Sequence, residues 1–266
     1  MARLVPDALK GFNLSDAQIS GIIPINTLGH NITIGITGLQ DLTTFGEDFI
    51  TQPTSITSFE VRSTSIQDDN SGGTGAKKVE IIYLDINWSE QSYIVVLNGT
   101  TPVTQDESAN TLQAIKFISI TVIDPVPTNA QHTAVGDITA KAIGDGITYA
   151  KIDAGGNQEL ACRRTIPDGF TFYMDQWKPS IGKLANNGDE VAFYLRGTCT
   201  KKDRTLTNNV FIFQDIAHLL SNGEPIPIRP VLTFPSRCEI KVSAQLNGGG
   251  TAVGSASFEG WLVPNA

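Results

Sequence analysis

The chain has few of the residues that most enzyme and metal sites need. It contains three histidines in 266 residues: His30, His132 and His218. None of them stands in an HExxH or GxSxG signature, and no pair of carboxylates stands out for glycoside hydrolysis. The sequence therefore predicts neither a catalytic site nor a metal site, and it gives no reason to expect a cofactor.

Cysteine is equally scarce, with Cys162, Cys199 and Cys238 far apart and no CxxC pair. We expect three reduced thiols in strands rather than a metal site or a disulfide framework.

Long apolar runs are absent. The longest, such as Ile94–Leu97, fall far short of the ~20 residues that span a bilayer. The N-terminus, MARLVPDALKGF, lacks the apolar core of a signal peptide. We expect a soluble chain that is made in a cytoplasm and has no membrane partner.

Basic residues are outnumbered, with 19 Lys and Arg against 27 Asp and Glu, a net charge of −8 and a pI near 4.9. An acidic surface repels phosphates, so we expect no nucleic-acid partner.

What the sequence has in quantity is short alternating apolar segments, separated by turns rich in Gly, Pro, Asn and Ser. The period of two predicts strands, and several of these strands are apolar on both faces, which is typical of a sandwich. The predicted strands include residues 59–62, 79–84, 93–97, 115–121, 160–165, 170–177, 191–196 and 210–214.

The clearest alternation lies near the C-terminus, where Ile240, Val242, Ala244 and Leu246 alternate with polar residues. A glycine-rich turn at residues 248–250 follows, so we expect a terminal hairpin. Only residues 215–221 look helical within this half of the chain.

Residues 1–50 have no sustained period beyond one helical turn at 13–19 and an alternating segment at 30–36. Scattered Pro and Gly predict an extended N-terminal arm that lies on another surface. Its apolar residues Ile22, Ile23 and Ile25 need to be covered, so they are candidate interface residues. A free solvated arm is the competing interpretation.

The fold expected from these patterns is all-β, with two β-sandwich (jelly-roll-like) units and an extended N-terminal arm. The predicted divisions are 1–50 for the arm or first strands, 51–154 for the first sandwich and 155–266 for the second, because residues 150–157 read as a turn.

Three glycine- or aspartate-rich segments invite a ligand. Residues 72–78 resemble a phosphate loop, but no Ser or Thr follows the lysine and a strand rather than a helix comes next. Asp68, Asp69 and Asn70 could hold calcium, as could residues 144–146, but these two segments lack the remaining ligands. We interpret all three segments as turns.

Aromatic residues at strand spacing are more typical of a core than of a sugar platform. Those considered are Trp88, Tyr93, Phe170, Phe172, Tyr173 and Trp177. Trp88 is the exception, because its neighbours Asn87, Ser89 and Glu90 are polar. Its ring would be exposed unless it docks on another chain or domain, so Trp88 joins the candidate interface residues.

The order GTGA…V.I..LD..W.E.S..V.LNGTTPV at residues 73–103 resembles virion structural proteins of tailed bacteriophages, especially those of marine bacteria. The likeness continues at residues 136–139, 156–158, 165–169 and 258–262. It covers about residues 56–180 and the C-terminal segment, and the first block is the most specific.

This resemblance implies a capsid cement, decoration or head-spike protein that binds the major capsid protein, forms a homotrimer and sits on the capsid surface of the virion. An alternative is a host-receptor-binding module of a fibre or spike, which would use exposed aromatics. A polysaccharide depolymerase is a third possibility, but the internal repeats typical of such enzymes are absent.

Overall fold

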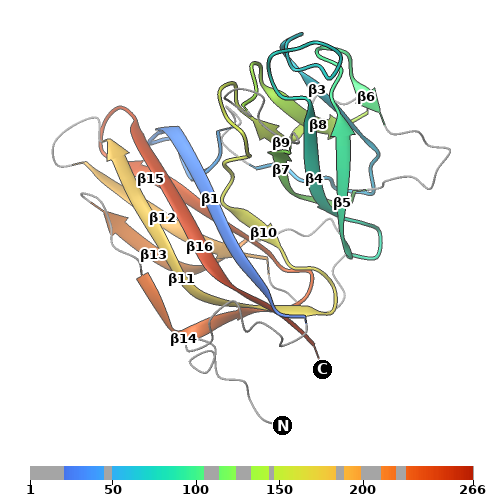
Figure 1. The fold of residues 1–266 in the computed structure, drawn as a ribbon. Helices are drawn as coiled ribbons and strands as arrows, with labels where there is room; N and C mark the ends of the chain where they lie inside the picture. The colour runs from blue at the N-terminus through green and yellow to red at the C-terminus, as the bar shows by residue number, and fades with distance from the viewer. Residues whose placement is uncertain are drawn as a thin grey trace.

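The chain is all-β. The computed structural model describes residues 21–44, 50–104, 114–123, 133–143, 147–183, 189–198, 211–219 and 226–265. These residues form sixteen strands in four antiparallel sheets, and no helix occurs among them (Figure 1).

Two of the sheets pack into the larger unit, which we call the base unit. Sheet 1 has the order β1 (Ile23–Ile34), β16 (Ala252–Pro264), β11 (Phe170–Lys183), β14 (Ile226–Phe234). Sheet 2 has the order β10 (Arg163–Thr165), β15 (Glu239–Asn247), β12 (Glu190–Gly197), β13 (Ile212–Leu219), with β2 (Gln40–Asp41) also on β15.

The other two sheets form the inserted unit. Sheet 3 has the order β6 (Val103–Thr104), β3 (Phe59–Ser63), β8 (Ile138–Ala142), β9 (Thr148–Ile152). Sheet 4 has the order β5 (Glu90–Val96), β4 (Lys78–Leu84), β7 (Lys116–Val122).

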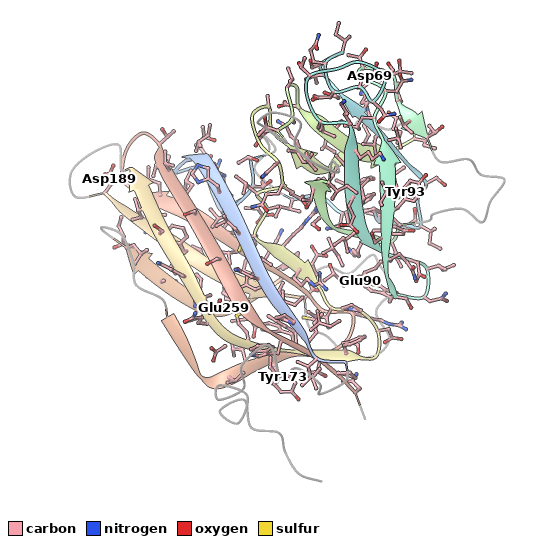
Figure 2. All side chains as sticks on the ribbon, in the orientation of Figure 1. Asp69, Glu90, Tyr93, Tyr173, Asp189 and Glu259 are labelled. Atoms are coloured by element: carbon pink, nitrogen blue, oxygen red, sulfur yellow. The ribbon has the colours of Figure 1, made fainter. Side chains whose placement is uncertain are left out.

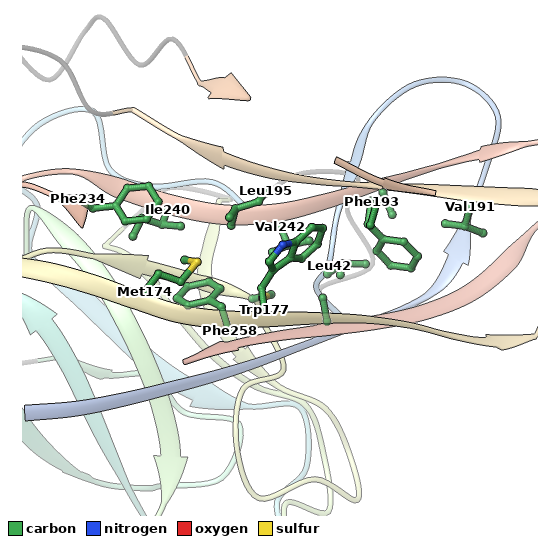
Figure 3. Packing of buried hydrophobic residues seen from close by; sticks show 14 of the residues in the cluster. Leu42, Met174, Trp177, Val191, Phe193, Leu195, Phe234, Ile240, Val242 and Phe258 are labelled. Carbon is green, nitrogen blue, oxygen red and sulfur yellow. The ribbon is translucent and has the colours of Figure 1, made fainter. Parts of the chain in front are cut away.

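Each unit has its own core. In the base unit, Trp177 and Phe258 of sheet 1 face Phe193 and Val242 of sheet 2, and all four are fully buried (Figure 3). In the inserted unit, Phe117 contacts Phe59 and stacks on Tyr149 at 5.3 Å. Apolar burial from facing sheets, at about 25 cal/mol per Å², stabilises each sandwich.

The inserted unit interrupts the base unit in sequence. The base-unit core contains Ile34 and Leu42, then resumes at Cys162, whereas the core of the inserted unit runs from Phe59 to Ile152. An isolated bridge pairs Thr43 with Ala161, so the two connections lie side by side where they leave the base unit.

The described part of residues 1–50, predicted as an arm or first strands, consists of strands that pair within the base unit. Residues 23–34 form β1, which pairs with β16 through Ile23↔Leu262 to Ile34↔Ala252, and β2 pairs with β15. The segment is therefore part of the base sandwich. The predicted helical turn at 13–19 lies outside the described residues.

Two further local predictions are wrong. Residues 215–219 belong to β13, not to a helix, because pairing with β12 places Ala217 inward and lets Asp215 accept a hydrogen bond from Trp177. β15 and β16 do not form a hairpin, because they belong to different sheets. The turn at 248–250, where Gly250 has a φ of 85°, instead carries the chain across the sandwich.

The expectation of three reduced thiols is wrong for Cys238, which is disulfide-bonded. Cys162 is a free thiol. Burial raises the pKa of Cys162 to about 12, which leaves the thiol protonated and unreactive.

Candidate interaction surfaces and the junction between the units

The hairpin that links β4 and β5 is built to present Trp88. The carboxylate of Asp85 accepts hydrogen bonds from the backbone of Asn87 at 2.8 Å and of Ser89 at 3.0 Å. Trp88 itself has a φ of 61°, in the left-handed region that non-glycine residues rarely adopt. The turn thus holds this residue in a strained conformation, which the contacts of Trp88 must offset.

Those contacts are with the base unit of the same chain. The Trp88 carbonyl accepts a hydrogen bond from the Asp168 backbone at 2.9 Å, and the Arg237 guanidinium lies 5.6 Å from the ring centroid. Arg237 also donates to Asp168 at 2.8 Å, and this hydrogen bond lowers the pKa of the Asp168 carboxyl. The half-buried ring packs on the inserted unit's Leu84 cluster. Trp88 therefore docks between the two units.

Two ion pairs reinforce this junction. Lys116 of β7 donates to Glu239 of β15 at 3.1 Å, and both side chains are buried. Arg164 of β10 pairs with Glu90 of β5. Burial lowers the pKa of Arg164, while the charge of Glu90 opposes that shift. Removing one partner of the buried Lys116–Glu239 pair leaves an uncompensated charge, so this pair in particular fixes how the units meet.

The polar side of β15 is buried as well. Its alternation is as predicted, but Lys241 and Ser243 do not face water, because Asp41 accepts hydrogen bonds from Lys241 at 2.7 Å and from Ser243. Arg196 donates to the same carboxylate at 2.8 Å. The Phe211 ring covers the Lys241 ammonium at 4.2 Å. These contacts form a buried polar layer on the side of β15 that faces away from the base-unit core.

The second connection carries one more buried charge. Arg163 donates to Glu159 at 2.6 Å, and both side chains are almost fully buried. Burial raises the pKa of Glu159 to about 7, although the Arg163 guanidinium pulls it down.

The candidate residues of β1 and its start have different environments. Ile25 packs partly on the base-unit core and Ile22 is half-buried, but Ile23 is 41% exposed. Leu28 and Ile32 lie further along the same edge strand, and their side chains are 46% and 62% exposed. The structure thus assigns Ile25 an intramolecular role and leaves Ile23, on the core side of β1, and Leu28, on the outer side, in contact with solvent together with Ile32.

The loop that was considered for calcium is organised by Asp68. Its buried carboxylate accepts hydrogen bonds from the backbones of Ala76 (2.9 Å), Val135 (2.9 Å) and Gly136 (2.8 Å), and from the Ser63 hydroxyl (2.5 Å). These donors occupy both carboxylate oxygens of Asp68, so its side chain stabilises the loop through hydrogen bonds instead of binding a cation. Residues 144–146 lie outside the described part of the chain.

Among the described residues, no group of three or more His, Cys, Asp or Glu could hold a metal ion. His218 pairs with Glu190 on the surface, and His30 lies on β1; His132 lies outside the described residues. The part of the chain that the structure describes contains no helix long and apolar enough to cross a membrane.

The aromatic candidates divide between core and surface. Phe172 and Trp177 are fully buried, and Tyr93 and Phe170 pack at the margins of the cores. Tyr173 instead lies on the solvent side of sheet 1, directly across from Trp261. Sequence reasoning did not find this pair, because it depends on the register between β11 and β16.

No protein-family model matches this chain, and no curated protein matches it. Among solved structures, the chain shows a weak structural resemblance to a viral capsid protein, a mutant VP2 protein of infectious bursal disease virus in derived T=1 particles. The identity is 10%, the alignment covers 92% of this chain and 78% of that chain, and the TM-score is 0.11. A likeness this weak carries no argument about the role of the chain.

Proposed function

We propose that this chain is a non-enzymatic structural protein of a tailed-phage virion, a cement or decoration protein that binds the major capsid protein on the outside of the head. The proposal draws on the motif block at residues 73–103 and on how the units are joined. It assigns the chain no catalytic residue and no cofactor.

The observation that carries the proposal is a contrast between the junction and the edge of sheet 1. The buried Lys116–Glu239 pair, the Arg164–Glu90 pair and Trp88 hold the two sandwiches together, as a protein that bridges capsid subunits requires. At the same time Ile23, Leu28 and Ile32 remain exposed on an edge strand, where an apolar surface favours association. We assign this edge to contacts within a homotrimer or with the capsid protein.

Light scattering and co-sedimentation test the proposal. The purified chain is expected to have three times the 28.5 kDa mass and to pellet with capsids that lack it. The double variant Leu28→Lys, Ile32→Lys should lose at least one of these properties. Its matched control is Ile66→Lys in the inserted unit, where the side chain is 70% exposed. A monomer with no affinity for capsids contradicts the proposal.

The alternative of a host-receptor module drew on exposed aromatics such as Trp88, together with Tyr or Asn residues in loops. Because its ring packs between the units beneath Arg237, Trp88 no longer supports that alternative.

A further inference from the structure

We propose that β1 holds its partner by strand addition, in which an extended segment of the capsid protein pairs with the free edge of β1 at residues 24–28. This inference rests on the proposed function, because it takes the capsid protein as the partner, and it specifies how that partner is bound. β1 is the edge strand beside β16 in sheet 1 and is drawn in blue in Figure 1.

The backbone of every second β1 residue faces away from β16. The His30 N–H points to this free side, because it donates to the carbonyl of Leu160 at 3.5 Å. β1 and β16 pair without a register shift over residues 23–31, so Asn26 and Leu28 present their N–H and C=O groups on the same side as His30. Within the described part of the chain, these groups of Asn26 and Leu28 have no hydrogen-bond partner.

The composition of β1 is also that of a strand that can accept a neighbour. Pro24 has no N–H, and proline is tolerated in a sheet where that position faces the free side of an edge strand. None of the twelve residues of β1 is charged, although charge is a common means by which an edge strand avoids pairing. The edge is therefore open over residues 24–28 and closes at His30, where Leu160 occupies it.

The side chains beside this edge indicate which residues an added strand should carry. On the outer face of sheet 1, Pro24 lies in one row with Trp261, and Leu28 is exposed at the other end of the open edge. Asn26 lies between them, in one row with Glu259, which Figure 2 labels. A segment paired with residues 24–28 thus has apolar neighbours at both ends and a polar neighbour at its centre, so we expect an apolar–polar–apolar order at its alternate positions.

A second copy of β1 does not complete this edge. Antiparallel pairing of two copies over residues 24–28 is symmetric about Asn26, and it places each Leu28 carbonyl opposite the Pro24 nitrogen of the other copy. This nitrogen cannot donate, so both Leu28 carbonyls would lose a partner at the contact. A segment of another protein with an N–H at that position pairs with the whole edge, which favours the capsid protein as the occupant.

Asn26→Pro tests the role of the backbone. It removes an N–H that faces the free side and leaves the hydrogen bonds between β1 and β16 in place. Co-sedimentation with capsids that lack the chain should weaken about tenfold or more, because the partner strand loses a donor and meets the proline ring. The matched control is Asn26→Ala, which keeps the N–H and should bind as the unaltered chain does. Equal losses for the two variants, or a loss for neither, would overturn strand addition.

Hydrogen exchange of the unaltered chain is a second measurement, which does not depend on the folding of a variant. The amides of Asn26 and Leu28 should exchange about tenfold or more slowly on capsids than in the purified chain, while those of β5, the edge strand of sheet 4, should not change. Unchanged exchange at Asn26 and Leu28 overturns the inference. Protection that is already present without capsids assigns the edge to a neighbouring copy and overturns the capsid protein as the occupant.

The two proposals fail in different ways. If the unaltered chain does not pellet with capsids, the proposed function fails and strand addition fails with it. If the unaltered chain pellets and Asn26→Pro pellets equally well, strand addition fails alone and the capsid-binding role stands.

Discussion

Among single residues, Trp88 contributes most visibly to holding the two units together, because its ring, its carbonyl and its strained backbone are all used at the junction. Trp88→Ala should lower the free energy of unfolding by about 2–3 kcal/mol, since it removes a half-buried aromatic and a cation–π contact. Urea unfolding measures the change.

Ile86→Ala is the matched control, because Ile86 lies in the same turn and is 53% exposed. Its effect should stay within about 0.5 kcal/mol. Equal effects of the two variants would contradict the docking of Trp88.

The free energy of unfolding should depend on pH through Glu159, and the burial of this carboxyl sets the sign of that dependence. Its pKa rises from an ordinary value of 4.5 to about 7 in the folded chain, mainly through desolvation. A carboxyl with a raised pKa stabilises the fold most when it is protonated, below its unfolded pKa. That stability is lost as the pH rises through about 7.

The unfolding free energy should therefore fall by up to about 3 kcal/mol between pH 5 and pH 8 through this one group. Glu159→Gln cannot titrate and should show a flatter profile over the same range, whatever its stability at a single pH. Parallel profiles for the two proteins would show that Glu159 is ionised throughout, as a strong pair with Arg163 would make it.

At the scale of elements, the loop before β4 depends on one carboxylate. Asp68→Ala leaves three backbone N–H groups and the Ser63 hydroxyl without their acceptor, so the inserted unit should lose about 3–5 kcal/mol. Thermal unfolding measures this loss. Asp69→Ala, at a neighbour whose carboxylate accepts hydrogen bonds from Ser71 in the same turn, should cost less than about 1 kcal/mol. A small effect of Asp68→Ala would mean that water replaces the carboxylate.

Sequence patterns predicted individual strands but not how the strands pair. Alternation identified β4, β5, β15 and β16, because apolar residues at every second position must share a buried face. It could not identify partners, so β15 and β16 were expected to pair although they lie in opposite sheets. Residues 215–219 were predicted as a helix for a related reason. Their local preference for a helix is weak, and pairing with β12 decides that they form a strand.

The sequence predicted that Trp88 needs a contact, but not which residues supply it. Trp88 stood out because a tryptophan in a polar turn needs a partner, but nothing in the sequence indicated that Arg237 supplies it. The pairs Lys116–Glu239 and Arg164–Glu90 join residues distant in sequence, and no spacing rule finds such pairs. Tyr173 and Trp261 likewise meet only through strand register.

At the scale of the whole molecule, one sandwich is inserted into another. The base unit is made from both ends of the described chain, and the inserted unit leaves it through the paired connections at Thr43 and Ala161. Ion pairs on both sides of these connections restrict how the units move against each other.

A cryo-electron microscopy map of tailed-phage particles whose genome encodes this chain tests the central claim most directly. We predict density for both sandwiches on the outside of the head, in threefold clusters, with the β1 edge against a neighbouring chain or the capsid protein. Particles in which the chain is absent from the head and tail would contradict a structural role in the virion.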